Sequence, residues 1–184
     1  KYYGSGKVEE GRKSIKVQTP HLRADVVPCV QYRWYRSNPQ SAGDYVEGMR
    51  FWVQEEHRWV INYPKIHYAN GVDKNSSTEG RYKHMVRIFK NAKSFLVGKE
   101  TIPPDLAPSY FLECLLYNVP NRKFTGSLQE GFFNILDWLV GADLDELTCQ
   151  NEQLPLFGDS PEQWEAVKAT KFIHSMCQLW KNWK

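Results

Sequence analysis

The residues of this sequence that could do chemistry are a carboxylate, a row of cations, and a hydroxyl beside an aromatic ring. In chain order they are Asp25, the row Lys83, Arg87 and Lys90, and the pair Ser109-Tyr110. Carboxylate oxygens bind Mg²⁺, cations and helix N-termini hold phosphate groups, and aromatic rings stack on nucleobases. Together these side chains are the parts of a phosphoryl-transfer site.

Each of these groups also has a structural interpretation. Asp25 could form an ion pair with Arg23, two residues earlier, and Tyr110 could belong to the hydrophobic core. The cations lie at i, i+4 and i+7, where like charges on a helix repel one another weakly. A bound polyanion would offset this repulsion, but long basic side chains also extend singly into water.

Other motifs lack the spacing that their chemistry requires. The segment Gly4-Ser5-Gly6-Lys7 does not fit the G-x-x-x-x-G-K-[ST] pattern of a phosphate-binding loop. Asp143 and Asp145 follow a helix that we expect to be buried, where surface acids are ordinary. The five histidines form no H-E-x-x-H motif, so no hydrolase is indicated. The absence of a C-x-x-C pair argues against a zinc site and a disulfide framework; the cysteines are Cys29, Cys114, Cys149 and Cys177.

The composition is that of a folded globular protein. Apolar residues make up 41% of the 184 residues and include seven tryptophans, so a hydrophobic core can form. No stretch approaches the ~20 apolar residues of a membrane span, and no apolar signal segment opens the chain, so we expect a soluble cytoplasmic protein. Because the chain starts without Met, we expect it to be part of a longer one.

Charge is unevenly distributed along the chain. Residues 1–99 contain 18 Lys and Arg against 9 Asp and Glu, whereas residues 100–184 contain 6 against 12. The basic first half favours an anionic ligand such as phosphate, with an unevenly charged, solvated surface as the alternative.

The first part of the sequence has the alternating pattern of β-strands. Strand-forming residues flank the turn Thr19-Pro20-His21, and Asp25 falls on the face opposite the more apolar one. Pro28 donates no hydrogen bond, so we expect it at a strand edge or a bulge. The predicted strands are 12–17 and 22–32, followed by a loop at 37–44, a hairpin of 49–53 with 58–62, and an irregular segment at 63–75.

The second part has the pattern of four helices. Ser76-Ser77-Thr78 can cap the first, in which apolar residues recur at helical spacing from Tyr82 to Leu96. The second begins at 107–110, and the third covers 128–140 and is apolar nearly all round, which predicts that it is the most buried. The fourth is expected to begin at Ser160-Pro161-Glu162. Strands followed by helices predict an α+β fold.

Several segments, in their order and spacing, resemble one known family. They are Ala24-Asp25-Val26-Val27-Pro28, Asn62-Tyr63-Pro64-Lys65, Arg81-Tyr82-Lys83, Val86-Arg87-Ile88-Phe89-Lys90, Pro108-Ser109-Tyr110, Glu113-Cys114-Leu115-Leu116-Tyr117 and residues 172–183. Over nearly all of its length the chain is similar to the C-terminal part of the CD-NTases. These are bacterial nucleotidyltransferases that resemble cyclic GMP-AMP synthase, DncV and oligoadenylate synthase.

The resemblance implies two domains. Residues 1–75 would be the C-terminal part of a mixed or antiparallel nucleotidyltransferase sheet of the polymerase-β type, which carries the third catalytic Asp. Residues 76–184 would be a nucleotide-binding domain of about four helices, similar to that of oligoadenylate synthase, packed against the sheet.

The resemblance also implies an activity. Members of the family are Mg²⁺-dependent enzymes that make cyclic di- or oligonucleotide second messengers from nucleoside triphosphates in bacterial anti-phage signalling. Asp25 matches the third of three carboxylates that hold two Mg²⁺ ions, with Mn²⁺ as the alternative metal. Lys90 and Ser109 match residues that contact the donor triphosphate, and Tyr110 matches the aromatic residue that stacks on a base. Lys83 and Arg87 would extend this nucleotide-binding face.

The chain departs from the family in one respect. The family's G-S and D-x-D motifs precede the third carboxylate by many residues, but only 24 residues precede Asp25 here. Asp143 and Asp145 cannot replace them, because they follow Asp25 and come after a helix. We therefore expect this chain to be inactive by itself and to need the missing N-terminal half.

Two further hypotheses stay open. The chain could be a non-catalytic helical module that binds a nucleotide or, less expectedly, a nucleic acid, or it could be a structural domain with no ligand. We expect nucleoside triphosphates as ligands and no membrane partner.

Overall fold

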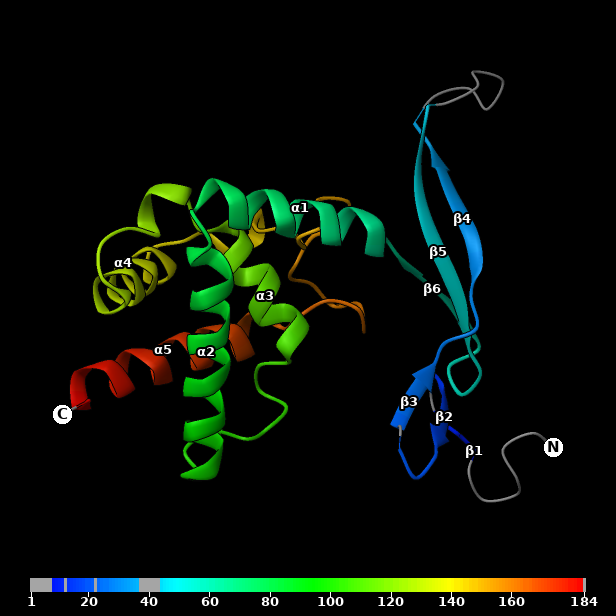
Figure 1. Cartoon of the computed structure of the whole chain (residues 1–184), viewed down its shortest axis with the longest axis horizontal. Coiled ribbons are helices and arrows are strands. Elements are labelled where there is room, and N and C mark those ends of the chain that lie inside the picture. Colours follow the sequence, from blue (N-terminus) through cyan, green and yellow to red (C-terminus); the bar gives the residue numbers. More distant parts are fainter. Residues whose placement is uncertain (1–7, 12, 22, 37–43, 184) are drawn as a thin grey trace. The chain divides into compact units, whose positions relative to one another are not determined.

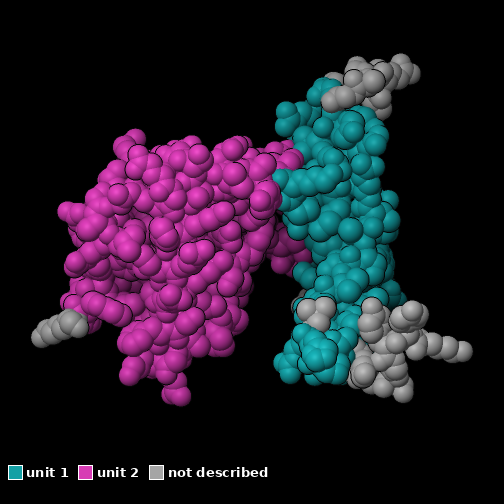
Figure 2. Space-filling model, in the orientation of Figure 1, with its two compact units in different colours: residues 1–65 teal, residues 66–184 magenta. Residues whose placement is uncertain are grey.

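The computed structural model describes residues 8–11, 13–21, 23–36 and 44–183, which form two antiparallel sheets and a set of helices (Figure 1). The predicted α+β class is confirmed. The chain divides into two compact units, residues 1–65 and 66–184 (Figure 2). None of the helices within the described segments has the length and apolar character of a membrane span.

The strands are β1 (Val8–Glu10), β2 (Ile15–Gln18), β3 (Arg23–Val26), β4 (Val30–Tyr35), β5 (Tyr45–Val53) and β6 (Arg58–Asn62). The helices are α1 (Pro64–Ser77), α2 (Arg81–Gly98), α3 (Ser109–Asn118), α4 (Leu128–Val140) and α5 (Ala166–Asn182), with short 3₁₀ turns at Asn121–Lys123 and Leu144–Glu146.

The first sheet has the strand order β1-β2-β3. The pairing of β2 with β3 confirms the two neighbouring strands predicted from 12–17 and 22–32. The prediction of one continuous strand over 22–32 is wrong, because the chain leaves this sheet after Val26 and enters the second sheet at Val30. Pro28 lies in the break, where its missing N–H group costs no ladder hydrogen bond.

The second sheet has the order β4-β5-β6. Strands β5 and β6 pair from Met49↔Asn62 to Val53↔Arg58, which confirms the predicted hairpin. Of the loop expected at 37–44, residues 37–43 lie outside the described part of the chain.

Helix α1 occupies the segment expected to be irregular, so that prediction is wrong. Its N-terminus is favourable, because Pro64 fits the first helical position, where no N–H donor is needed. Its sequence shows no apolar stripe, and Gly71 is the one α1 residue that is buried. The division between the units falls at 65/66, near the start of α1, whereas the family resemblance implied a domain boundary after residue 75.

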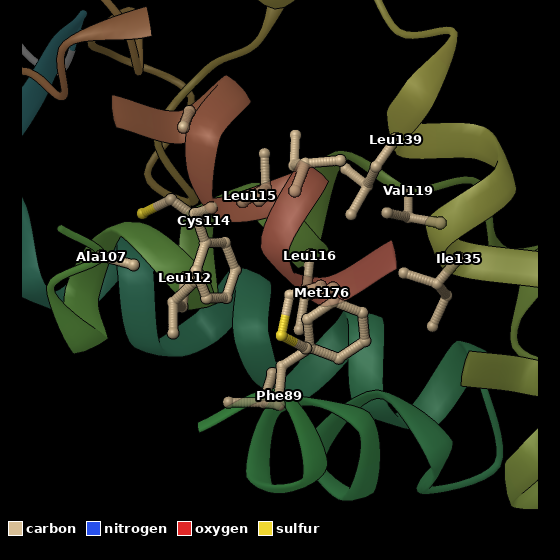
Figure 3. Close-up of a cluster of buried hydrophobic side chains, with 14 of the residues drawn as sticks. Phe89, Ala107, Leu112, Cys114, Leu115, Leu116, Val119, Ile135, Leu139 and Met176 are labelled. Carbon is tan, nitrogen blue, oxygen red and sulfur yellow. The ribbon is translucent and has the colours of Figure 1, made fainter. Parts of the chain in front are cut away.

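The hydrophobic core of the second unit is built from α2, α3, α4 and α5 (Figure 3). The predicted stripe of α2 is confirmed, since its members are all buried; they are Tyr82, Met85, Val86, Phe89 and Leu96. The prediction that Ser76-Ser77-Thr78 caps this helix is wrong, because Ser76 and Ser77 end α1 and the N-cap of α2 is Gly80, which has no capping side chain. The hydroxyl of Thr78 still accepts a hydrogen bond from the backbone N–H of Tyr82 at 3.1 Å and so satisfies one donor in the first turn.

Helix α4 is not the most buried helix, contrary to the prediction. Its side chains Phe133 and Val140 are 49% and 66% exposed, whereas α3 contributes four residues with no exposed surface: Leu112, Cys114, Leu115 and Leu116. Helix α4 is therefore apolar both on the face that packs into the core and on the face that is exposed to solvent.

The last helix begins at Ala166 rather than at the predicted 160–162. Residues 160–163 form a turn, in which Gln163 N–H donates to the carbonyl of Ser160 at 2.8 Å. Burial of Trp164, whose indole N–H donates to the Leu106 carbonyl at 3.0 Å, holds this segment outside the helix. Tertiary packing thus overrides a local helix-start signal.

Candidate functional site

The site in the second unit is built on the packing of α2 against α3. The buried stripe of α2 faces the core, and this orientation places Lys90 beside α3. The Lys90 ammonium lies 3.2 Å from a carboxylate oxygen of Glu113, and both side chains are about one third exposed, at 33% and 34%. Lys90 is therefore ordered at the edge of the core and is still reachable from solvent.

Helix α3 begins at Ser109 with an open N-terminus. The preceding residue, Pro108, provides no side-chain cap, and the first backbone hydrogen bond runs from Leu112 N–H to the Pro108 carbonyl at 3.1 Å. The N–H groups of residues 109–111 have no carbonyl partner within their own helix, and with the helix dipole they favour an anion. Ser109 precedes Glu113 by one helical turn, so the hydroxyl, the helix start and Lys90 share one face of the α2–α3 pair.

Tyr110 has one end in the protein and one side open to solvent. Its ring stacks on the imidazole of His67 with centroids 5.3 Å apart and an interplanar angle of 20°. Burial raises the pKa of Tyr110 above its usual range, and the neighbouring thiols of Cys114 and Cys149 add to this shift. The residue as a whole is 36% exposed, so the ring is rigidly held while part of it is available for contact.

His67 of α1 belongs to the same cluster. Its Nδ1 atom is buried and has no hydrogen-bond partner among the residues the structure describes. Burial lowers the pKa of His67, the carboxylate of Glu113 opposes this shift, and the ammonium of Lys90 adds to it. His67 is therefore neutral at pH 7 and lies within the field of both charged groups.

Gln150 connects the helices that carry the site. It is 2% exposed, and its side chain accepts a hydrogen bond from the Tyr82 hydroxyl at 2.5 Å and donates one to the His67 carbonyl at 2.7 Å. Its own carbonyl accepts a hydrogen bond from the Asn70 side chain at 2.8 Å. A Cβ at Gly71 would overlap the Gln150 amide, so glycine is required for α1 to approach this closely. The position of His67 depends on this buried network.

The other two predicted cations remain at the surface. Lys83 and Arg87 are exposed on α2, and within the described part of the chain neither forms an ion pair. Lys90 thus pairs with Glu113, which lies one helical turn from Ser109, and Tyr110 stacks on His67, while Lys83 and Arg87 are exposed. A role for any of the five predicted residues in nucleotide binding stays a prediction.

Asp25 lies in the first unit, on β3. It is exposed, and its cross-strand neighbour in the register is Lys16 of β2, which in turn pairs with Glu9 of β1. Its carboxylate is a hard oxygen ligand of the kind Mg²⁺ prefers. However, the described residues contain no group of three or more His, Cys, Asp or Glu side chains arranged to hold a metal ion.

Sequence reasoning missed two members of the cluster as site residues. Glu113 was noted only as part of a motif, although its spacing of four residues from Ser109 placed it on the same helix face. His67 had no such signal, because it lies in the segment that was predicted to be irregular.

Comparisons with known proteins agree with this architecture. Residues 69–181 match the model of the cGAS/DncV-like nucleotidyltransferase C-terminal helical domain. The chain is 53% identical over 182 residues to the cyclic UMP-AMP synthase of Rhodothermus marinus and 42% identical over 186 residues to the cyclic nucleotide synthase CdnE01 of Staphylococcus haemolyticus. These alignments cover 99% and 98% of the chain but 63% and 62% of the relatives, so the chain spans less than two thirds of their length.

Two solved structures are similar to the chain. The structure of Rhodothermus marinus CdnE c-UMP-AMP synthase with Apcpp and Upnpp has a TM-score of 0.94 and 53% identity, covering 99% of this chain and 62% of that one. The structure of Elizabethkingia meningoseptica CdnE cyclic dinucleotide synthase with GTP and Apcpp has a TM-score of 0.80 and 31% identity, covering 97% of this chain and 66% of that one.

Proposed function

Because the chain belongs to the cGAS/DncV-like nucleotidyltransferase family, we propose that the whole protein joins nucleoside triphosphates into cyclic di- or oligonucleotide second messengers. The observation that supports this most directly is that Lys90, the uncapped start of α3 and the Tyr110 ring all lie in the second unit, where Lys90 forms an ion pair with Glu113 of α3. The two similar structures are of a c-UMP-AMP synthase with Apcpp and Upnpp and of a cyclic dinucleotide synthase with GTP and Apcpp.

The groups of the second unit have distinct tasks in this proposal. Lys90 and the free N–H groups of residues 109–111 bind the phosphates, and the Ser109 hydroxyl donates a further hydrogen bond to them. The Tyr110 ring, which packs against the imidazole of His67, stacks on a nucleobase. Lys83 and Arg87 raise the positive potential along the approach to Lys90.

Mg²⁺ is the metal we propose for the reaction, because it neutralises the triphosphate and activates an attacking hydroxyl. Asp25 would supply one ligand oxygen. A single carboxylate cannot position two ions, so we place the other two carboxylates in the part of the relatives that this chain does not match. On this basis the 184-residue chain binds nucleotides and forms no product by itself.

A chimera tests the proposal. This chain is joined to the part of the Rhodothermus marinus synthase that it does not match, and the protein is incubated with four labelled triphosphates and Mg²⁺. Mass spectrometry should identify a cyclic nucleotide, and the chain alone should give none. Asp25→Asn should abolish the product while the circular dichroism spectrum stays unchanged. Full activity of that variant would contradict a metal-binding role for Asp25.

A non-catalytic nucleotide-binding module is the second candidate. It is favoured because every proposed phosphate and base contact lies within residues 66–184, whereas Asp25, the proposed metal ligand, lies in the other unit. In this case the chain binds a triphosphate analogue but the chimera yields no product, so the same experiment separates the two functions.

We also propose that the whole protein acts in the bacterial cytoplasm in defence against phage. The support is that the bacterial relatives are synthases of cyclic nucleotides, which are small enough to act as diffusible signals. Plaque counts on cells that carry the gene should fall relative to cells that carry the Asp25→Asn variant, and equal counts would contradict this role.

A further inference from the structure

Lys90 is already engaged by a carboxylate before any ligand arrives. Its ammonium lies 3.2 Å from Glu113, at a position where both groups keep about one third of their surface exposed. The pair has no net charge, so in this state the site attracts an anion less than a free lysine would. A phosphate group that approaches Lys90 also approaches the Glu113 carboxylate.

The backbone of Glu113 is fixed, so the residue cannot move away from Lys90 as a whole. Its carbonyl lies 2.9 Å from the hydroxyl of Tyr82, which is buried on α2, and its neighbours on α3, Leu112 and Cys114, have no exposed surface. Only the side chain of Glu113 can rotate away. The carboxylate therefore stays within one helical turn of the Ser109 end of α3, where a bound phosphate would lie.

The other basic residues considered for the site, His67, Lys83 and Arg87, do not neutralise the Glu113 carboxylate. His67 lies close enough to feel both Lys90 and Glu113 but is neutral at pH 7, because its burial disfavours the imidazolium form. Lys83 and Arg87 on the same helix are exposed to solvent, where water and salt screen them.

We propose that Glu113 sets the affinity of this site for triphosphate by competing with the phosphates for Lys90. In the free protein the carboxylate orders the lysine, and on binding the triphosphate takes over the ammonium while Glu113 turns toward water. The proposal rests on the proposed function, since it needs Lys90 to contact phosphate. It concerns binding only and involves no covalent step.

A purely structural ion pair predicts a different outcome. If Glu113 only joins α2 to α3, its removal leaves phosphate affinity unchanged or weakens it by loosening Lys90. If Glu113 competes with the ligand, its neutralisation strengthens binding. The sign of the change in affinity therefore distinguishes the two interpretations.

The experiment measures binding of inorganic tripolyphosphate and of Apcpp to the 184-residue chain by calorimetry at low and at high ionic strength. Glu113→Gln removes the charge and keeps the shape, Glu113→Asp keeps the charge, and Lys90→Ala removes the ammonium. Asp137→Asn is the matched control, because Asp137 forms an ion pair of the same length, 3.2 Å, with Lys123 on other elements. Circular dichroism verifies the fold of each variant.

We expect Glu113→Gln to bind both probes about fivefold to tenfold more tightly at low salt, an advantage that shrinks at high salt. Glu113→Asp and Asp137→Asn should bind like the unchanged protein, and Lys90→Ala should bind more weakly. Unchanged or weaker binding by Glu113→Gln would overturn the proposal, as would an equal gain in Asp137→Asn, which would indicate a bulk-charge effect. If neither probe binds, or if Lys90→Ala has no effect, the phosphate-binding function itself fails together with this proposal.

Discussion

Gly71→Ala tests the buried junction that positions the site. Gly71 lies in α1 against Gln150, and a Cβ added there would overlap the Gln150 Nε2 atom and lie 3.3 Å from its Cδ atom. Gln150 is 2% exposed and its amide nitrogen is tied to the His67 carbonyl at 2.7 Å, so the side chain has no open space into which it can move.

The magnitude follows from two opposing effects. Loss of the buried hydrogen bond together with overpacking costs about 2–4 kcal/mol. Alanine stabilises a helix interior relative to glycine by about 1 kcal/mol. We therefore expect Gly71→Ala to lower the free energy of unfolding of the second unit by about 1–3 kcal/mol. It should also weaken nucleotide binding, because His67 moves.

Urea denaturation followed by tryptophan fluorescence measures the change, with buried Trp164 reporting on the second unit. Gly98→Ala at the end of α2 is the matched control, since a Cβ there meets nothing within 4 Å, so stability should stay the same or rise slightly. In a Gln150→Ala background the overlap is absent, so Gly71→Ala should become neutral or stabilising. A Gly71→Ala variant as stable as the unchanged chain would refute the assignment of this junction.

Other predictions concern single groups. His67→Phe keeps a ring against Tyr110 and should retain Apcpp affinity, whereas His67→Ala should reduce it severalfold in calorimetry; equal affinities would show that the stack is unimportant. Burial lowers the pKa of Lys74 to about 8. Between pH 8 and the usual pKa of a lysine, Lys74 is therefore protonated in the unfolded state and neutral in the folded state. The folded state should therefore gain stability across this interval as pH rises, and Lys74→Met should abolish that gain in urea titrations. Ser127 and Glu130 form a reciprocal capping box at the start of α4, so Ser127→Ala should cost about 1 kcal/mol in the same assay, and no loss would contradict the cap.

The elements with a strong apolar period could be predicted from the sequence, and those fixed by tertiary contacts could not. Helix α2 has a stripe from Tyr82 to Leu96 that faces the core, and the β5–β6 hairpin has clear alternation. Helix α1 buries only a glycine and is held by hydrogen bonds to Gln150, more than 70 residues away, so local periodicity carries no signal for it. The false helix start at Ser160 has the same cause, since burial of Trp164 decides the local structure.

In the candidate site, too, some residues could be predicted from the sequence and others depend on tertiary packing. Lys90, Ser109 and Tyr110 follow from helix spacing and from resemblance, because each lies at a recognisable place on a helix. The partners that tune them depend on how the helices pack. Glu113 neutralises Lys90 and His67 stacks on Tyr110, and neither contact follows from spacing within one element.

The most direct test of a nucleotide site at the start of α3 is an amide NMR titration of the 184-residue chain with Apcpp. We expect the largest chemical-shift changes at the N–H groups of residues 109–111 and around Lys90, with contacts from adenine protons to the Tyr110 ring. Changes confined to other surfaces, or an unchanged spectrum at saturating Apcpp, would contradict a nucleotide site at the start of α3.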